Sequence, residues 1–238
     1  MKKIKIFVHL IDNVSGYEFY ANRLADNLIS SKLINAAEEV NFVYNYKLIP
    51  TNWKFLQEKL KDYNNVNFIQ GKGIPQDFEI PTIMELKKSA DSCIDECYYL
   101  YLHLKGVTHS PLADNAADDL AKMLIYCNIQ KWEECVAALD HGYDVAGVNW
   151  WDAYSAWHYP GNYWWAKSSY LKTLPNLEFP HKVQFKRQLQ YGGITDDWYR
   201  AEAEIWIGGS PAKAYNVARI PPGVQPGWTR FDESSYTY

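Results

Sequence analysis

Short apolar runs alternate with longer segments of helical periodicity over the first 150 residues of the chain. The apolar runs have the length and the β-branched and aromatic content of buried strands. The segments between them carry hydrophobic residues three and four positions apart, which is typical of helices that cover a sheet. The predicted strands are Ile4–Ile11, Asn41–Tyr46, Val66–Ile69, Tyr98–Leu104 and Tyr143–Asn149, and the predicted helices are Gly16–Ser30, Trp53–Lys61, Pro81–Ile94 and residues 115–139 with a break near Gln130.

This alternation predicts an α/β fold with a mostly parallel sheet and helices on both faces. Ser15 and Asn52 are the expected N-caps of the first two helices, and Pro81 suits the first turn of the third. Beyond residue 150 the aromatic, glycine and proline residues become denser and the periodicity fades. We therefore expect one α/β domain with an irregular second half, followed by a surface tail at 220–238.

The net charge and the composition indicate which classes of binding partner to expect. The net charge is −4 and no Lys/Arg run exceeds Lys2-Lys3, so general electrostatic binding to nucleic acid is not expected. Aromatic residues reach 16%, which suits a polar, ring-shaped ligand. The apolar run Ile4–Ile11 is too short for a signal core or a membrane span. We expect a cytoplasmic protein, with peripheral contact to a membrane surface left open.

Several common catalytic signatures are missing from the sequence. There is no GxGxxG, no GxxxxGK[ST], no HExxH and no GxSxG. The sequence therefore lacks the motifs of dinucleotide-binding proteins, P-loop NTPases, zinc proteases and hydrolases with a nucleophile elbow. The four cysteines form no CxxC pair. The sequence predicts that they are buried free thiols in a reducing compartment.

The segment His158–Ala166 combines a histidine, a proline, a glycine, an asparagine and four aromatic residues in HYPGNYWWA. Aromatic faces beside hydrogen-bonding groups are what a protein needs to hold a sugar ring. Trp164 and Trp165 would point to opposite sides of a strand, so that one anchors the core while the other, or Tyr163, faces the ligand. The alternative is a rigid aromatic turn that fills a core.

Ligands of an open parallel sheet lie beyond the carboxyl ends of its strands, and polar residues follow three of the predicted strands. His103 and Lys105 are two positions apart, so they would project to one side as a cationic pair for a diphosphate. The alternative is a snorkelling lysine beside a hydrogen-bonded histidine. The three groups are His9 with Asp12, His103 with Lys105 and Gly106, and Asn149 with Asp152.

A dense acidic and aromatic cluster follows near residue 200. Glu204 precedes the apolar run Ile205–Ile207, and a carboxylate among apolar neighbours is suited to act as a general base. Arg200 lies four positions before Glu204, so the alternative is an ordinary salt bridge along a helix.

Four motifs together resemble a family of bacterial and viral glycosyltransferases over about residues 4–208. Members of that family carry a YLHxKG strand, an H-[FY]-x-GN-[FY]-WWA segment and a terminal ExWI. The corresponding motifs here are Tyr101–Gly106, Asp144–Asn149, His158–Ala166 with Ser169–Leu171, and Glu204–Ile207.

The resemblance implies a GT-A-like fold in a domain at 1–219. A Rossmann-type nucleotide-sugar half at about 1–110 would merge with an acceptor half at about 111–219. Such enzymes usually hold a divalent metal, manganese or magnesium, through a DxD motif. Here His103-Leu-Lys105 stands in the corresponding place, so we expect the two cationic groups to neutralise the diphosphate; the alternative is a metal recruited by Asp114 or Asp152.

The resemblance further implies transfer of a sugar from a UDP- or GDP-linked donor to a hydroxyl of a glycan or glycolipid, with inversion. Glu204 is the expected base, with His158 and Asp152 as alternatives. The expected donor-binding residues are His9, Asp12, His103, Lys105 and Gly106, and the expected sugar- and acceptor-binding residues are Asn149, Gly161, Asn162, Trp164, Trp165 and Arg200.

Two other functions fit parts of this pattern. A carbohydrate-binding protein without catalytic activity would need the aromatic cluster but not His103 and Lys105. A glycosyltransferase acting on modified DNA bases would need a nucleic-acid surface, which the acidic net charge disfavours.

Overall fold

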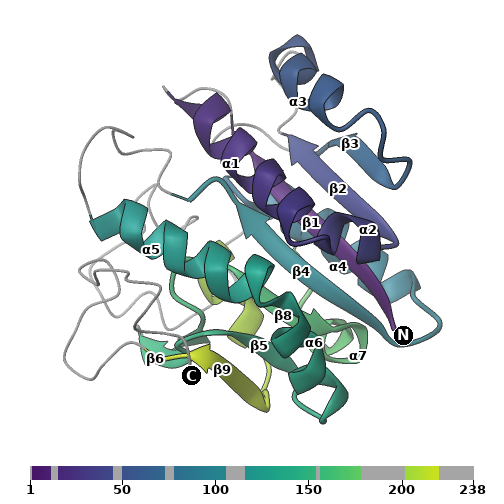
Figure 1. Cartoon of the computed structure of the whole chain (residues 1–238). Coiled ribbons are helices and arrows are strands. Elements are labelled where there is room, and N and C mark those ends of the chain that lie inside the picture. The colour runs from purple at the N-terminus through teal and green to yellow at the C-terminus, as the bar shows by residue number, and fades with distance from the viewer. Residues whose placement is uncertain are drawn as a thin grey trace, which may run out of the picture.

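A mixed, mostly parallel sheet of seven strands forms the centre of the molecule, in the order β3-β2-β1-β4-β8-β5-β9 (Figure 1). The computed structural model describes residues 2–11, 16–44, 50–72, 78–105, 116–153, 156–177 and 202–219. The strands of this sheet are β1 (Lys3–Leu10), β2 (Glu39–Tyr44), β3 (Val66–Gln70), β4 (Cys97–His103), β5 (Val145–Val148), β8 (Trp164–Lys167) and β9 (Ala214–Ala218). A second pair of strands, β6 (Trp151–Ala153) and β7 (Ala156–His158), forms a small antiparallel sheet.

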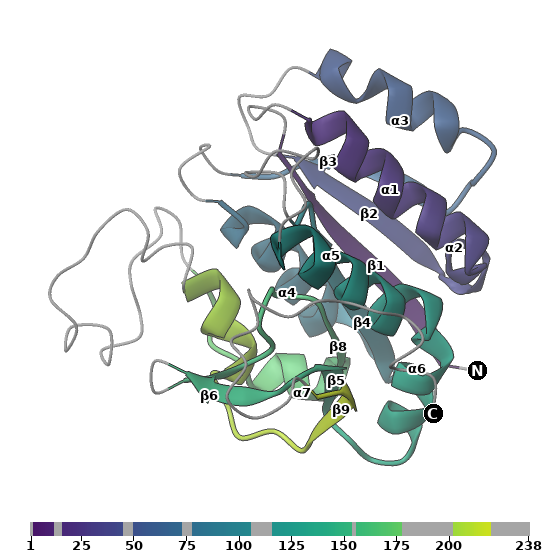
Figure 2. The ribbon, with the colours of Figure 1, turned by 60° about the vertical axis from the view of Figure 1, so that its left-hand side comes forward.

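Helices cover both faces of the seven-stranded sheet, as the alternating pattern predicts (Figure 2). One core contains the inward residues of five α-helices and of the helical turn at 126–130 on one face, and a second core contains those of α4, α7 and the turn at 206–208 on the other. The first group is α1 (Tyr17–Ser30), α2 (Leu33–Ala36), α3 (Lys54–Lys59), α5 (Ala116–Ile125) and α6 (Trp132–Asp140), and the second is α4 (Ile80–Ser92), α7 (Ser168–Thr173) and η5 (Trp206–Gly208).

The elements predicted from periodicity over the first 150 residues are confirmed, with small shifts at their ends. Pro81 lies in the first turn of α4, where its missing N–H leaves no bond unmade. The break expected near Gln130 is η3 (Tyr126–Gln130), a π-helical turn between α5 and α6. The expected cap Asn52 is wrong, because residues Pro50–Trp53 form a 3₁₀ turn, η1, and Trp53 is the N-cap of α3. Ser15 lies outside the described residues.

Strand β8 runs antiparallel between β4 and β5, and this changes the interpretation of the two tryptophans. Trp164 and Trp165 do point to opposite faces, since one belongs to each core. Both are 0% exposed, and Tyr163 is 1% exposed. The expectation that one of these rings faces a ligand is therefore corrected: helices cover both faces of the sheet, so both rings are core.

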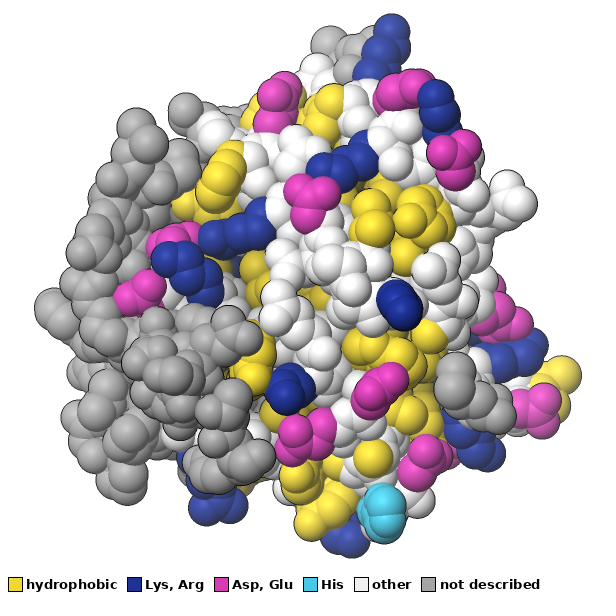
Figure 3. Space-filling model, in the orientation of Figure 1, with side chains coloured by type: hydrophobic (Ala, Val, Ile, Leu, Met, Phe, Trp, Pro, Cys, Tyr) yellow, Lys and Arg dark blue, Asp and Glu magenta, His cyan; other side chains and the backbone are white. Residues whose placement is uncertain are grey.

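Basic and acidic side chains are interspersed over the face that carries α1 and α5 (Figure 3). Arg23 of α1 is bonded to Asp118 of α5 at 2.6 Å, and Lys122 reaches the same carboxylate at 2.8 Å. The lysines and arginines of these two helices are thus paired rather than gathered into a basic patch. Among the residues described, none of the helices has the length and apolar character needed to cross a bilayer.

Candidate active site

The strand order places a topological switch point between β1 and β4. The chain moves from β1 outward through β2 to β3, and then returns to place β4 on the other side of β1. His9 and His103 are register partners at the carboxyl ends of these two strands. In open α/β sheets the crevice outside such a switch point is the usual ligand site. Glu79, His103 and Asn162 gather there.

A buried carboxylate, Glu79, organises this end of the sheet. It is 8% exposed and immediately precedes α4. Its Oε2 accepts hydrogen bonds from the Tyr101 hydroxyl at 3.0 Å and from Asn162 Nδ2 at 2.5 Å. Its Oε1 lies 3.3 Å from His103 Nδ1. Glu79 therefore joins the start of α4, the end of β4 and the turn before β8.

His103 is held through both of its ring nitrogens. Nε2 lies 2.8 Å from the carbonyl oxygen of Gly161, while Nδ1 faces Glu79. A carbonyl oxygen only accepts, so Nε2 carries a hydrogen. Nδ1 faces Oε1 of the Glu79 carboxylate at 3.3 Å. The ring is 8% exposed and positioned on both sides, which fixes its orientation at the strand end.

The segment Pro160-Gly161-Asn162 forms the turn that brings the HYPGN motif to this site. The Asn162 N–H donates to the Tyr159 carbonyl at 3.0 Å, and Gly161 has a φ of 84°. Proline followed by glycine with positive φ is the residue pair that a type II turn requires. Asn162 also has positive φ, 55°, a conformation in which asparagine is enriched. Its side chain is thereby directed to Glu79 and, through Oδ1, to Trp164 Nε1 at 2.8 Å.

Replacing Gly161 by alanine is expected to lower the free energy of unfolding by about 2–4 kcal/mol. An alanine Cβ would lie 2.6 Å from Leu124 Cδ1 on a backbone that already has positive φ. Gly142 is the matched control, because its φ is 89° but the nearest atom to an added Cβ is 3.9 Å away. Gly142→Ala should lower the free energy of unfolding by only about 1 kcal/mol, the cost of placing alanine on a backbone with positive φ. Equal losses in the two variants, measured by denaturant unfolding, would show that the close packing of Gly161 contributes nothing.

A cation and a carboxylate both reach Gly161. The Gly161 N–H donates to Glu204 Oε1 at 2.6 Å, and Glu204 is half-buried in the helical turn at 202–205. A Cβ on Gly161 would lie 3.7 Å from Lys105 Nζ, so the lysine chain passes over the glycine. Within the described ranges no acidic side chain forms an ion pair with Lys105. Lys105 is thus a half-buried ammonium beside the turn, suited to bind an anion.

The straight strand expected through His103 and Lys105 ends at His103. The Lys105 N–H donates to the His103 carbonyl at 2.8 Å, which closes a tight turn. The two side chains therefore do not follow the alternation of a strand. Both nevertheless contact Gly161: His103 bonds to the Gly161 carbonyl oxygen, and the Lys105 side chain lies across the glycine.

His9 is uncharged at neutral pH. Burial lowers its pKa to about 4, with the nearby Glu79 acting in the opposite direction. Its Nδ1 lies 2.9 Å from the Thr82 hydroxyl in the first turn of α4. A neutral, 3% exposed ring is a structural support for the site rather than a cationic contact to phosphate. The proposal that His9 lies near the nucleotide therefore depends on its place at the switch point and not on its charge.

The buried His9 should make stability depend on pH. Its pKa is lower in the folded than in the unfolded chain, so the unfolded chain binds the extra proton, and stability is lost as pH falls from about 6.5 to 4. Between pH 7 and 4 the wild type should lose about 3 kcal/mol more than His9→Asn, which keeps a group for Thr82. His141→Asn, at an exposed histidine, should track the wild type. Parallel pH curves for wild type and His9→Asn would contradict this assignment.

Three further predicted residues, Asn149, Asp152 and His158, lie on or beside β5, β6 and β7, and three others lie outside the described residues. Asn149 ends β5 with a φ of 60°, and its N–H donates to the Ala218 carbonyl at 3.0 Å. His158 is 4% exposed on β7, with its ring centroid 6.4 Å from that of Trp151. Asp152 is the register partner of Trp157, and its side chain is not described. Asp12, Gly106 and Arg200 lie outside the described residues.

Sequence reasoning missed Glu79, Tyr101 and Thr82. Tyr101 lies two residues before His103 on β4, so the alternation of a strand places both side chains on the face covered by α4. The sequence signal for Glu79 is weaker: it is an acidic residue at the start of a helix whose first turn is indicated by Pro81. That position predicts an interaction with the helix N-terminus, and only the packing of α4 on the sheet reveals the contact with His103.

The described residues contain no group of three or more His, Cys, Asp or Glu side chains arranged to hold a metal ion.

No protein-family profile and no curated protein sequence matches this chain. Among solved structures, the crystal structure of 4-diphosphocytidyl-2C-methyl-D-erythritol synthase aligns over 99% of this chain and 94% of that one, with 9% identity and a TM-score of 0.37. The crystal structure of S. aureus TarS 1-349 aligns over 90% of this chain and 60% of that one, with 12% identity and a TM-score of 0.39. With TM-scores this low, neither likeness assigns an activity to this chain.

Proposed function

We propose that this protein is a glycosyltransferase that moves a sugar from a nucleoside diphosphate to an acceptor hydroxyl. The observation that carries the proposal is the turn at Gly161, where the Lys105 ammonium and the Glu204 carboxylate approach one glycine at the switch point of the sheet. Sugar transfer needs both kinds of group close together. One stabilises the negative charge of the leaving diphosphate, and the other accepts the proton of the acceptor hydroxyl.

In the proposed reaction Glu204 removes the proton from the acceptor hydroxyl as its oxygen bonds to the anomeric carbon of the donor sugar. The bond between that carbon and the diphosphate oxygen breaks, and its electron pair stays with the diphosphate. Lys105 stabilises the charge that develops there, and Glu79 and Asn162 hold His103 and the turn in place. A single displacement of this kind inverts the configuration at the anomeric carbon.

The β6–β7 hairpin supports an acceptor site beside Glu204. Trp157 is 50% exposed and Trp151 is 38% exposed, so both rings are accessible to a sugar face. The Trp157 carbonyl packs directly on Gly208, in the turn that follows the helical residues 202–205. We therefore transfer the sugar-stacking role expected of Trp164 and Trp165 to Trp157. The Glu204 base and a glycan or glycolipid acceptor remain parts of this proposal.

Lys105→Ala is expected to raise the dissociation constant of UDP or GDP about 10- to 100-fold, because a charged contact to phosphate is lost. Calorimetric titration in excess chelator measures this and also shows whether binding requires a metal ion. Lys88→Ala is the control, since that side chain is 78% exposed on α4 and should leave binding unchanged. Equal affinities in Lys105→Ala and wild type would remove Lys105 from the donor site.

The function itself is tested by incubating the wild type with a panel of UDP- and GDP-sugars and simple glycan acceptors, and measuring release of the nucleoside diphosphate. Release that depends on both donor and acceptor supports glycosyl transfer. A protein that binds the glycans but neither binds nor cleaves any nucleotide sugar would instead be a carbohydrate-binding protein.

A further inference from the structure

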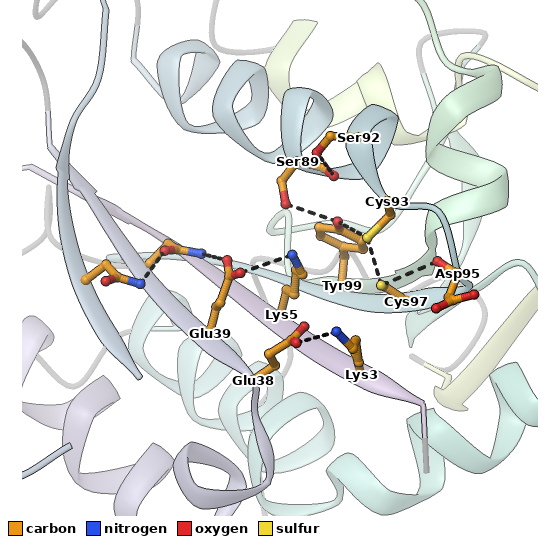
Figure 4. A network of polar contacts seen from close by, with 12 residues as sticks. Lys3, Lys5, Glu38, Glu39, Ser89, Ser92, Cys93, Asp95, Cys97 and Tyr99 are labelled. Carbon is orange, nitrogen blue, oxygen red and sulfur yellow. Dashed lines mark hydrogen bonds and ion pairs between the residues drawn. The ribbon is translucent and has the colours of Figure 1, made fainter. Parts of the chain in front are cut away.

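Two thiols meet at the amino end of the sheet, opposite the candidate active site. Cys93 follows the last turn of α4 and Cys97 is the first residue of β4. Their Sγ atoms lie 2.7 Å apart (Figure 4). Unbonded sulfur atoms are normally further apart than this, so a bond between them requires little movement of either side chain.

A cavity of about 260 Å³ gives access to both sulfur-bearing residues. Lys3, Lys5 and Ile94 line it together with the two cysteines, and Ile94 is 98% exposed at its rim. Cys93 is half-buried, whereas Cys97 is 2% exposed. A small reagent can therefore meet Cys93 first, with Cys97 directly behind it.

The surroundings distinguish the two thiols chemically. Burial, with the adjacent Cys93 as a second cause, raises the pKa of Cys97 to about 12, so Cys97 stays protonated at neutral pH. Lys5 is the register partner of Tyr99 and lies on the same side of the sheet as both sulfur atoms (Figure 4). The Lys5 ammonium is paired with Glu39 at 3.1 Å, so the greater exposure of Cys93 is what distinguishes the two thiols. The accessible Cys93 is thus the sulfur that reacts first.

We propose that Cys93 and Cys97 are an oxidation site at which a low-molecular-weight disulfide converts the two thiols into an intramolecular disulfide. The Cys93 thiolate attacks one sulfur of the reagent, forms a mixed disulfide and releases one thiolate. Cys97 then gives its proton to the first released thiolate, and its sulfur attacks Cys93 Sγ, forms the Cys93–Cys97 bond and releases the second thiolate. The protons of both cysteines pass to the released thiolates, so two cysteine thiols are oxidised and one small disulfide is reduced.

This site is independent of the proposed sugar transfer. Strand β4 extends about 20 Å between Cys97 and His103, at about 3.3 Å per residue. Cys127 and Cys135 serve as internal controls, because both are buried and burial raises the pKa of each. They should be inert while the chain is folded.

The test treats the folded wild-type protein with oxidised glutathione, alkylates the remaining thiols and digests with a protease that cuts after acidic residues. Asp95 and Glu96 lie between the two cysteines, so cleavage there separates Cys93 from Cys97 unless a disulfide joins the peptides. We expect the joined peptides, formed at least ten times faster than any oxidation of Cys127 or Cys135. We also expect Cys97→Ser to retain glutathione on Cys93, and Cys93→Ser to show no adduct on Cys97.

Two results would overturn the proposal: separate peptides with both cysteines alkylated as in untreated protein, or equal oxidation of all four cysteines. Circular dichroism spectra verify that each variant is folded. If a variant fails to fold, the peptide map of the wild type decides alone.

Discussion

Replacing Glu204 by glutamine is expected to lower sugar-transfer turnover by about 10²- to 10⁴-fold, the usual contribution of a general base. Glutamine keeps the size of the side chain and an oxygen that can accept the Gly161 N–H, which Glu204 accepts at 2.6 Å. It cannot take a proton from an acceptor hydroxyl. The loss should therefore appear in kcat, measured as nucleoside diphosphate release with donor and acceptor present.

Donor affinity separates this interpretation from a loss of structure. UDP or GDP should bind to Glu204→Gln within about two-fold of the wild type, because Glu204 contacts neither nucleotide nor diphosphate in the proposed arrangement. Turnover close to that of the wild type would move the role of base to His158 or Asp152. A joint loss of donor binding and turnover would instead show that Glu204 supports the Gly161 turn.

Glu79→Gln is expected to lower the free energy of unfolding by about 3 kcal/mol, because it breaks a buried hydrogen-bonded network. The carboxylate accepts from Tyr101 and Asn162 while facing His103. A glutamine side chain offers one acceptor oxygen in place of two and carries no charge, so the network loses an acceptor and the negative charge that faces His103. Denaturant unfolding measures the change.

Glu85→Gln is the matched control on the same helix. Glu85 forms a long contact of 3.8 Å to Lys88, whose side chain is 78% exposed. Such surface pairs contribute little, so the change in unfolding free energy should stay within about 0.5 kcal/mol. If Glu79→Gln changes stability no more than Glu85→Gln does, Glu79 does not organise this end of the sheet.

The fold of the first 150 residues was predictable because its signals are local. Apolar runs, helical spacing and residues such as Pro81 each act within a few positions of the chain. The direction and place of β8 depend on pairing with β4 and β5, which are separated from it in sequence. Without that pairing the place of β8 in the middle of the covered sheet could not be foreseen, and one of Trp164 and Trp165 was expected to face a ligand.

The candidate site, too, was predictable only where its signals are local. His103, Gly161 and Glu204 were recognisable because a strand end, a proline–glycine turn and a carboxylate beside an apolar run each have a sequence signal. Their meeting at one glycine, and the part of Glu79 in it, come from the packing of α4 and of residues 202–205 against the end of the sheet. The contact between Cys93 and Cys97 likewise depends on how the end of α4 meets the start of β4.

A crystal structure with UDP or GDP bound tests the central claim most directly. The account predicts the diphosphate outside the carboxyl ends of β1 and β4, with a phosphate oxygen within hydrogen-bond distance of Lys105 Nζ and the Gly161 turn beside it. A nucleotide bound elsewhere on the molecule, or no nucleotide bound at concentrations that saturate known transferases, would contradict it.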